Sequence, residues 1–204
     1  MSFLTLLPMA IVMIAGPQIL SAIFLATSQD WKRNSIAYVL GAALSITIIA
    51  SAAFFIGGGK PGGSDGNDTI YWVVLGLLLV AMLRTYVKRG ESEPPKWMGK
   101  LQEASPGFSF RLGFLLLGVF PTDIITSVAV GSSLAANGDP WWHLFPFVAL
   151  TLLLLAAPLL ALLLMGERGQ TLLPKVRKWM TDNSWIVNEL VLLLFVGLTV
   201  SNLA

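Results

Sequence analysis

Cysteine is absent from this chain of 204 residues, and histidine occurs once, as His143. Without a thiol, the protein forms no disulfide and performs no thiol chemistry. A lone histidine beside Trp141 and Trp142 is more typical of an interfacial aromatic belt than of a metal site, which needs clustered ligands. The sequence also lacks a nucleotide-binding motif, a Ser/His/Asp set and a pair of neighbouring carboxylates. We therefore expect no enzyme, no metal and no cofactor.

Charged residues are scarce as well. They make up 12% of the chain, whereas 55% is hydrophobic, and the mean hydropathy is +0.77. A soluble domain of this composition would expose too much apolar surface, so we predict an all-α integral membrane protein. Six apolar segments have about the length of a bilayer-spanning helix. They cover roughly residues 3–28, 35–57, 70–87, 109–135, 142–165 and 184–203.

Basic residues are distributed unevenly between the connections. Of the 13 Lys and Arg residues, all but Lys60 lie in or beside the first, third and fifth connections. The positive-inside rule places these connections in the cytoplasm and both termini outside, in a multi-pass protein of the inner (cytoplasmic) cell membrane. The same bias explains the pI of about 9.0 without a nucleic-acid partner, which we do not expect. No Lys or Arg precedes Lys32, so the first segment is expected to stay in the mature protein rather than act as a signal peptide.

Two prolines, Pro17 and Pro121, interrupt the first and fourth apolar segments. Proline removes a backbone hydrogen bond and clashes with the preceding turn, so both helices are predicted to be broken there. The first helix would run inward and the fourth outward, which makes the two halves inverted repeats if they are homologous. We predict a single transmembrane domain, residues 1–204. It comprises one three-helix repeat over about 1–90, an amphipathic cytoplasmic linker over about 91–108 and a second three-helix repeat over about 109–204.

Polar residues gather around both prolines. A carboxylate at Asp123, near the middle of a membrane helix, must be protonated, paired or turned toward water. It is either a proton or cation coupling site or a cap that bonds backbone groups freed at the break, together with Thr122. Glu189 in the sixth segment either joins this site or reaches toward the cytoplasmic edge. The candidate substrate and coupling residues are Gly16, Pro17, Gln18, Ser21, Pro121, Thr122, Asp123, Thr126 and Glu189.

Each predicted cytoplasmic connection pairs tryptophan with basic residues. Trp and Lys at a membrane surface anchor a helix end near anionic headgroups. A dedicated docking site for a lipid headgroup is the sharper alternative. The residues concerned are Trp31, Lys96, Trp97, Lys178 and Trp179.

Several motifs resemble a known family. They include the run Pro94-Pro95-Lys96-Trp97-Met98, the run Ser105-Pro106-Gly107, the run Arg111-Leu112-Gly113-Phe114 and the opening Gly16-Pro17. Over nearly the whole chain the sequence resembles the glycolipid-addressing protein (GAP) family. This family includes the sulfolipid-addressing (Sap) proteins and belongs to the LysE transporter superfamily. The second break departs from the family pattern, because Phe120-Pro121-Thr122-Asp123 stands where an Asn-Pro-Lys-Asn-like sequence is usual.

The resemblance implies six helices in two inverted repeats and a role in moving a lipid or glycolipid toward the outer face. Membrane lipids and a lipid or small-molecule substrate are the expected partners, and a homodimer is expected only by analogy with other small transporters. Two alternatives stay open. The chain could export a small amino-acid-like solute, or it could be a non-transporting scaffold for a lipid synthase or a larger exporter.

Overall fold

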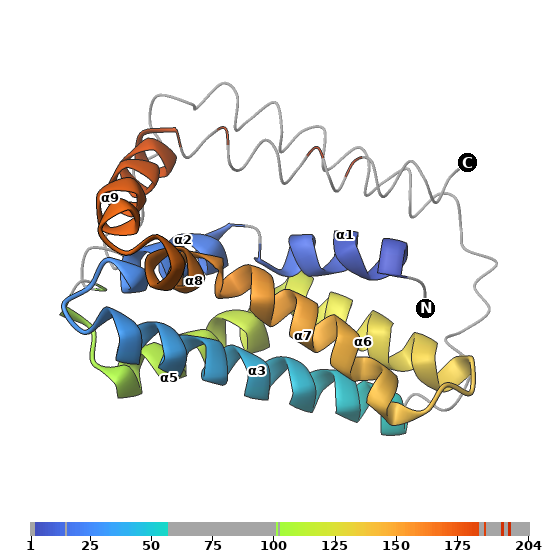
Figure 1. Ribbon diagram of the computed structural model, residues 1–204. Helices are drawn as coiled ribbons and strands as arrows, with labels where there is room; N and C mark the ends of the chain where they lie inside the picture. The colour runs from blue at the N-terminus through green and yellow to red at the C-terminus, as the bar shows by residue number, and fades with distance from the viewer. Residues whose placement is uncertain are drawn as a thin grey trace.

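The computed structural model describes residues 3–14, 16–56, 101, 103–183, 186, 193 and 196. All the regular elements in these ranges are helices, as the composition predicts (Figure 1). The predicted third segment, most of the sixth, and the connection over residues 57–68 lie outside the described residues. The elements are α1 (Phe3–Ile14), α2 (Pro17–Ala26), α3 (Trp31–Ile56), α5 (Pro106–Val119), α6 (Pro121–Ala136), the short 3₁₀ helix η2 (Trp141–His143), α7 (Leu144–Leu155), α8 (Ala157–Met165) and α9 (Glu167–Asp182).

Three of the apolar segments are pairs of helices joined at a bend. The axis turns by 68° between α1 and α2, by 69° between α5 and α6, and by 58° between α7 and α8. Proline is the first residue of α2 and of α6, and Pro158 is the second residue of α8. Proline suits the first turn of a helix because its missing N–H would have no partner there. Each bend therefore lies where the sequence places a proline in an apolar run.

The central contact of the fold joins α3 to α5 and α6. Both α5 and α6 run in the same direction as α3. Tyr38 lies opposite Gly113, Ser45 opposite Gly118, and Ala50 opposite Gly131. A Cβ added at Gly113 would overlap the backbone carbonyl oxygen of Tyr38. Glycine is thus needed for the two backbones to touch, as at other close crossings of membrane helices.

The substitution Gly113→Ala is expected to lower the free energy of unfolding by about 1–3 kcal/mol, because the added methyl overpacks this crossing. Thermal unfolding in detergent, followed by circular dichroism, measures the effect. Gly107→Ala is the matched control, since no atom lies within 4 Å of an added Cβ at Gly107 in the same helix. Equal melting temperatures for the two variants would contradict the close-contact explanation.

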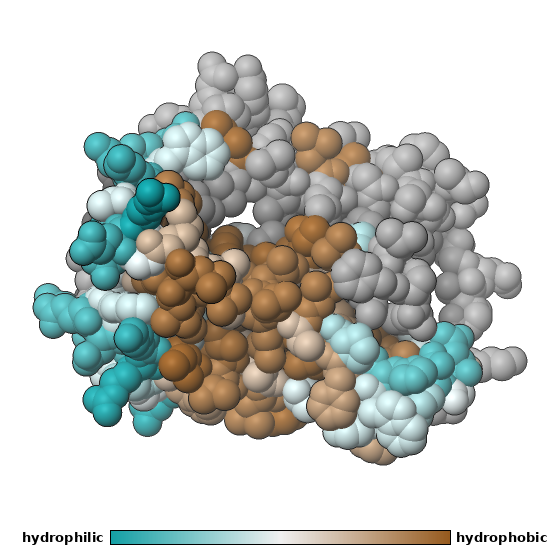
Figure 2. Space-filling model, viewed as in Figure 1, coloured by the Kyte–Doolittle hydropathy of each residue, from teal (hydrophilic) through white to brown (hydrophobic). Residues whose placement is uncertain are grey.

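Apolar side chains form a band across the middle of the molecule, with polar side chains at both ends of the visible face (Figure 2). One end gathers the end of α2, the start of α3, and α9 (left in Figures 1 and 2). Within the described ranges, α3 alone is long and apolar enough to cross a membrane, and each bent pair qualifies when its two helices are taken together. These features are those of a membrane-embedded helical protein.

The fifth connection is itself a helix. Residues Glu167–Asp182 form α9, and this helix contains the Lys178-Trp179 segment. Leu173 on α9 is buried, whereas Lys178 and Trp179 are exposed. The apolar face of α9 packs against α2 and α8, while most of its basic side chains stay exposed outside the bundle.

Candidate substrate site at the broken helices

The two proline breaks meet in the core through a side-chain hydrogen bond. The amide nitrogen Nε2 of Gln18 donates to the carboxylate oxygen Oδ2 of Asp123 at 2.7 Å. The exposed fractions are 1% for Gln18 and 0% for Asp123. Because 105 residues separate them in the sequence, this bond directly connects the start of α2 to the start of α6.

Local backbone conformation brings both side chains to this point. Gly16 caps α2 at φ 94°, ψ −136°, a region that side-chain-bearing residues rarely adopt. Phe120 caps α6 in an extended conformation, φ −67° and ψ 125°, as is usual for a residue before proline. At each break the chain therefore leaves one helix, turns sharply and begins the next helix at a proline. The polar residues that follow lie in a first helical turn, where negative charge is stabilised by the helix dipole.

Further polar groups surround the Gln18–Asp123 pair. The hydroxyl of Tyr38 on α3 donates to the backbone carbonyl oxygen of Gln18 at 2.9 Å. Among the described residues, six buried side-chain polar atoms lack a hydrogen-bond partner, and three of the six belong to α2 and α6: Oε1 of Gln18 and the hydroxyl oxygens of Ser21 and Ser127. Such atoms are uncommon in protein cores, and they retain capacity to bind a ligand group, an ion or water.

Thr122 and Asp123 do not cap the broken helix, so that alternative is wrong. The cap residue of α6, Phe120, receives no side-chain cap bond. The hydroxyl of Thr122 instead donates to Oδ1 of Asp123 at 3.4 Å, and the hydroxyl of Thr126 donates to the carbonyl oxygen of Thr122 at 2.7 Å. The carboxylate thus receives bonds from its own helix and from α2, because its side chain points into the core rather than back along α6.

The candidate interface residues lie apart from this junction. Trp31 begins α3 and carries the ammonium nitrogen of Lys32 5.2 Å from its ring centroid. Lys178 and Trp179 are exposed on α9. Lys96, Trp97 and Glu189 lie outside the described residues. In the described part of the chain, no three His, Asp or Glu side chains come together as a metal-ligand set.

Three contributors to the structure were missed by sequence reasoning. Tyr38 supports Gln18, and a phenol within an apolar segment is the signal that points to a buried polar partner. Asn34 donates to the hydroxyl of Ser28 at 2.9 Å and to the carbonyl oxygen of Ala104 at 2.8 Å, which ties the start of α3 to the segment before α5. Arg177 donates to the hydroxyl of Thr27 at 3.1 Å. The sequence around Asn34 and around Arg177 contains no motif that indicates these partners.

Comparison with protein families decides the classification. The family described as Sap, sulfolipid-1-addressing protein, matches residues 6–203. The chain belongs to this family. The match covers both proline breaks and confirms the resemblance based on the motifs around Pro17, the Lys96-Trp97 run and the Arg111-Leu112-Gly113-Phe114 run. Comparisons with curated proteins and with solved structures gave no match. Membership of the Sap family supports a lipid-related role in a membrane.

Proposed function

We propose that this Sap-family protein is a membrane transporter of the LysE superfamily that moves a lipid or glycolipid toward the outer face of the cell membrane. The observation that carries the proposal is the buried bond between Gln18 and Asp123 at the junction of the two broken helices. In many secondary transporters, substrate and coupling-ion sites lie where broken helices from two repeats meet near the bilayer midplane.

The directions of the described helices support an inverted-repeat arrangement. The α5–α6 pair runs parallel to α3, whereas the α1–α2 pair and the α7–α8 pair run in the opposite direction (Figure 1). The first two spans therefore run inward and then outward in the first half. The corresponding spans of the second half run outward and then inward. With the basic end in the cytoplasm, the start of α1 would lie on the outer side, in agreement with the positive-inside rule.

Asp123 is the proposed coupling group. A carboxylate held by one amide and one hydroxyl at the junction can exchange a proton or balance a cation while the substrate passes. The starts of α2 and α6 add partial positive charge, which favours an anionic headgroup at the same junction. Breaking and remaking the Gln18–Asp123 bond would separate and rejoin the two repeats during transport.

A lipid substrate is favoured over a small solute by an apolar groove between α3 and α6. The groove has a volume of about 400 Å³ and is lined mainly by Ile and Ala side chains of α3, with Val128 and Ser132 of α6. Val128 is five residues beyond Asp123, about 8 Å along the helix. An acyl chain could lie in this groove while its headgroup is near Asp123, whereas a small amino-acid-like solute would gain nothing from it.

Reconstitution of the purified full-length chain into liposomes tests the proposal. We expect a fluorescent glycolipid or phospholipid reporter to cross between leaflets faster than in protein-free liposomes, and a radiolabelled amino acid not to accumulate. Transport of the amino acid without the lipid would favour the solute exporter. No transport of any reporter would favour the scaffold for a lipid synthase or larger exporter.

A further inference from the structure

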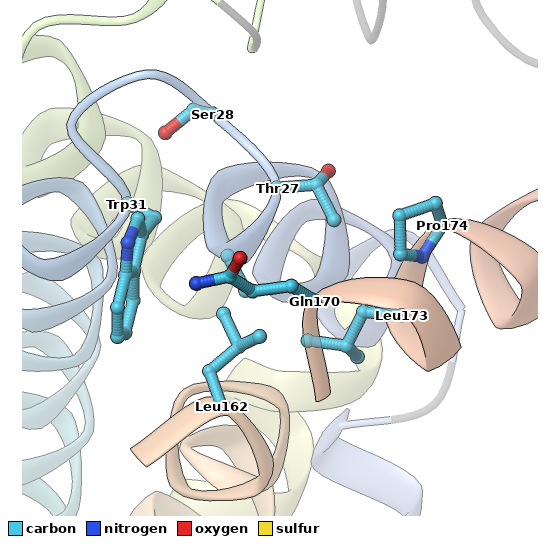
Figure 3. A pocket seen from close by; sticks show the side chains of 8 residues that line it. Thr27, Ser28, Trp31, Leu162, Gln170, Leu173 and Pro174 are labelled. Atoms are coloured by element: carbon cyan, nitrogen blue, oxygen red, sulfur yellow. The ribbon is translucent and has the colours of Figure 1, made fainter. Parts of the chain in front are cut away.

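A second cavity lies at the basic end of the molecule, between the end of α2, the start of α3, and helices α8 and α9 (Figure 3). Its volume is about 270 Å³. This is close to the lower limit of small-molecule sites, about 300 Å³, and suits a polar headgroup rather than a whole lipid. Asp123 and Gln18 do not line it, so it is distinct from the junction of the broken helices.

The lining of this pocket is amphipathic. Leu162 and Leu173 supply one apolar side, and the side chain of Gln170 extends between them and Trp31 (Figure 3). No lining residue is acidic or basic. The neutral N–H donors of Gln170 and Trp31 can therefore approach an anion without a competing carboxylate in the pocket wall.

Two cationic side chains are held against the rim. Lys32 lies over the Trp31 ring, and Arg177 donates to the hydroxyl of Thr27, with its guanidinium carbon 4.9 Å from the Phe24 ring centroid. Thr27 and Trp31 both line the pocket, so each cation contacts a residue of the lining, while Lys32 and Arg177 themselves do not line it. Cations fixed on two different helices make this rim a better anion site than a single mobile surface lysine would.

The surroundings of the pocket indicate where the anion comes from. Helix α9 exposes Trp179 and Lys178, a pairing typical of a helix at a membrane surface, while Leu173 packs against the bundle. A free anion would not need the apolar wall formed by Leu162 and Leu173. The first methylene groups of a lipid would be stabilised by it.

We propose that this pocket binds the anionic headgroup of a membrane lipid, a phosphate or sulfate ester, with Lys32, Arg177, Trp31 and Gln170 around it. Its use as the loading site for transport rests on the proposed function. Headgroup binding itself does not, and it is measured without any flux assay.

Binding of fluorescent short-chain phosphatidylglycerol to the full-length protein in neutral detergent tests the assignment. The substitution Gln170→Trp fills the pocket from an exposed helix position and is expected to weaken binding about tenfold or more. Thr171→Trp adds the same side chain at the next exposed position, outside the pocket, and is expected to change affinity by less than about twofold.

A second pair of variants tests the charge. Lys32→Gln is expected to weaken binding about fivefold, the usual effect of one basic residue near an anionic headgroup. Arg33→Gln removes the neighbouring exposed charge and keeps the one over Trp31. On a logarithmic scale, it is expected to weaken binding by less than half as much as Lys32→Gln does.

Three outcomes would overturn the assignment. Equal weakening within either pair of variants would indicate general surface attraction rather than a pocket. Equal affinity for short-chain phosphatidylcholine would show that the pocket does not select an anionic headgroup. Full competition by millimolar inorganic phosphate would indicate a site for the free anion. A protein that binds lipid here but moves none would contradict the proposed function and leave this inference intact.

Discussion

Asp123→Asn is expected to remove the dependence of lipid flux on an imposed pH gradient and to bring the flux close to that of protein-free liposomes. Asparagine has the size of aspartate, and its carbonyl oxygen can still accept the hydrogen bond from Gln18. The fold should therefore persist, while the group that exchanges a proton is lost. The measurement is reporter-lipid flux in proteoliposomes, with and without the gradient.

Asp182→Asn provides the matched control for this experiment, since Asp182 is exposed at the end of α9. It removes the same charge far from the junction and should leave flux unchanged. If the Asp123→Asn protein transports lipid with the wild-type response to the gradient, Asp123 has no part in coupling. The junction would then be a structural contact between the repeats.

The second large effect concerns the stability of the junction. Gln18→Leu removes the donor that the buried Asp123 carboxyl group receives from α2, and it is expected to destabilise the protein by about 1–3 kcal/mol. Most of this cost comes from leaving the oxygen Oδ2 of Asp123 without a donor in the core, rather than from the bond itself. Chemical or thermal unfolding in detergent measures the change.

A double variant separates these two contributions. Gln18→Leu combined with Asp123→Leu removes both partners and should recover most of the lost stability, because no buried group is left without a partner. Gln29→Leu, at an exposed position in the turn after α2, is the control for adding an apolar side chain. If the double variant is less stable than the Gln18→Leu variant, the loss of the donor to Asp123 does not account for the cost of Gln18→Leu, because removing the carboxylate brings no recovery.

The membrane class and the positions of the breaks were predictable from the sequence because both depend on local properties. Hydropathy adds up along a segment, and proline changes the backbone at its own position whatever surrounds it. The sequence predicted breaks at Pro17 and Pro121, and the structure has a bend at each. The family was recognisable for the same reason, since its motifs are short and contiguous.

The partner of each polar side chain was not predictable in this way. Asp123 could equally have capped its own helix, and choosing between a cap and a distant partner requires knowing which helices touch. That choice depends on the close approach of α3 to α5 and α6 at Gly113, which brings Tyr38 into the core near the junction. Helix α9 and the pocket beneath it were likewise missed, because contacts between helices define the pocket.

By itself, the sequence determined that this is a helical membrane protein of the Sap family with broken helices in both halves. The tertiary structure alone decided that the two breaks meet, with Gln18 bonded to Asp123, and that Thr27 and Trp31 line one pocket together with residues of α8 and α9. The physical reason is that hydropathy and proline geometry act within a few residues. A buried hydrogen bond across 105 residues exists only once packing has excluded water from both partners.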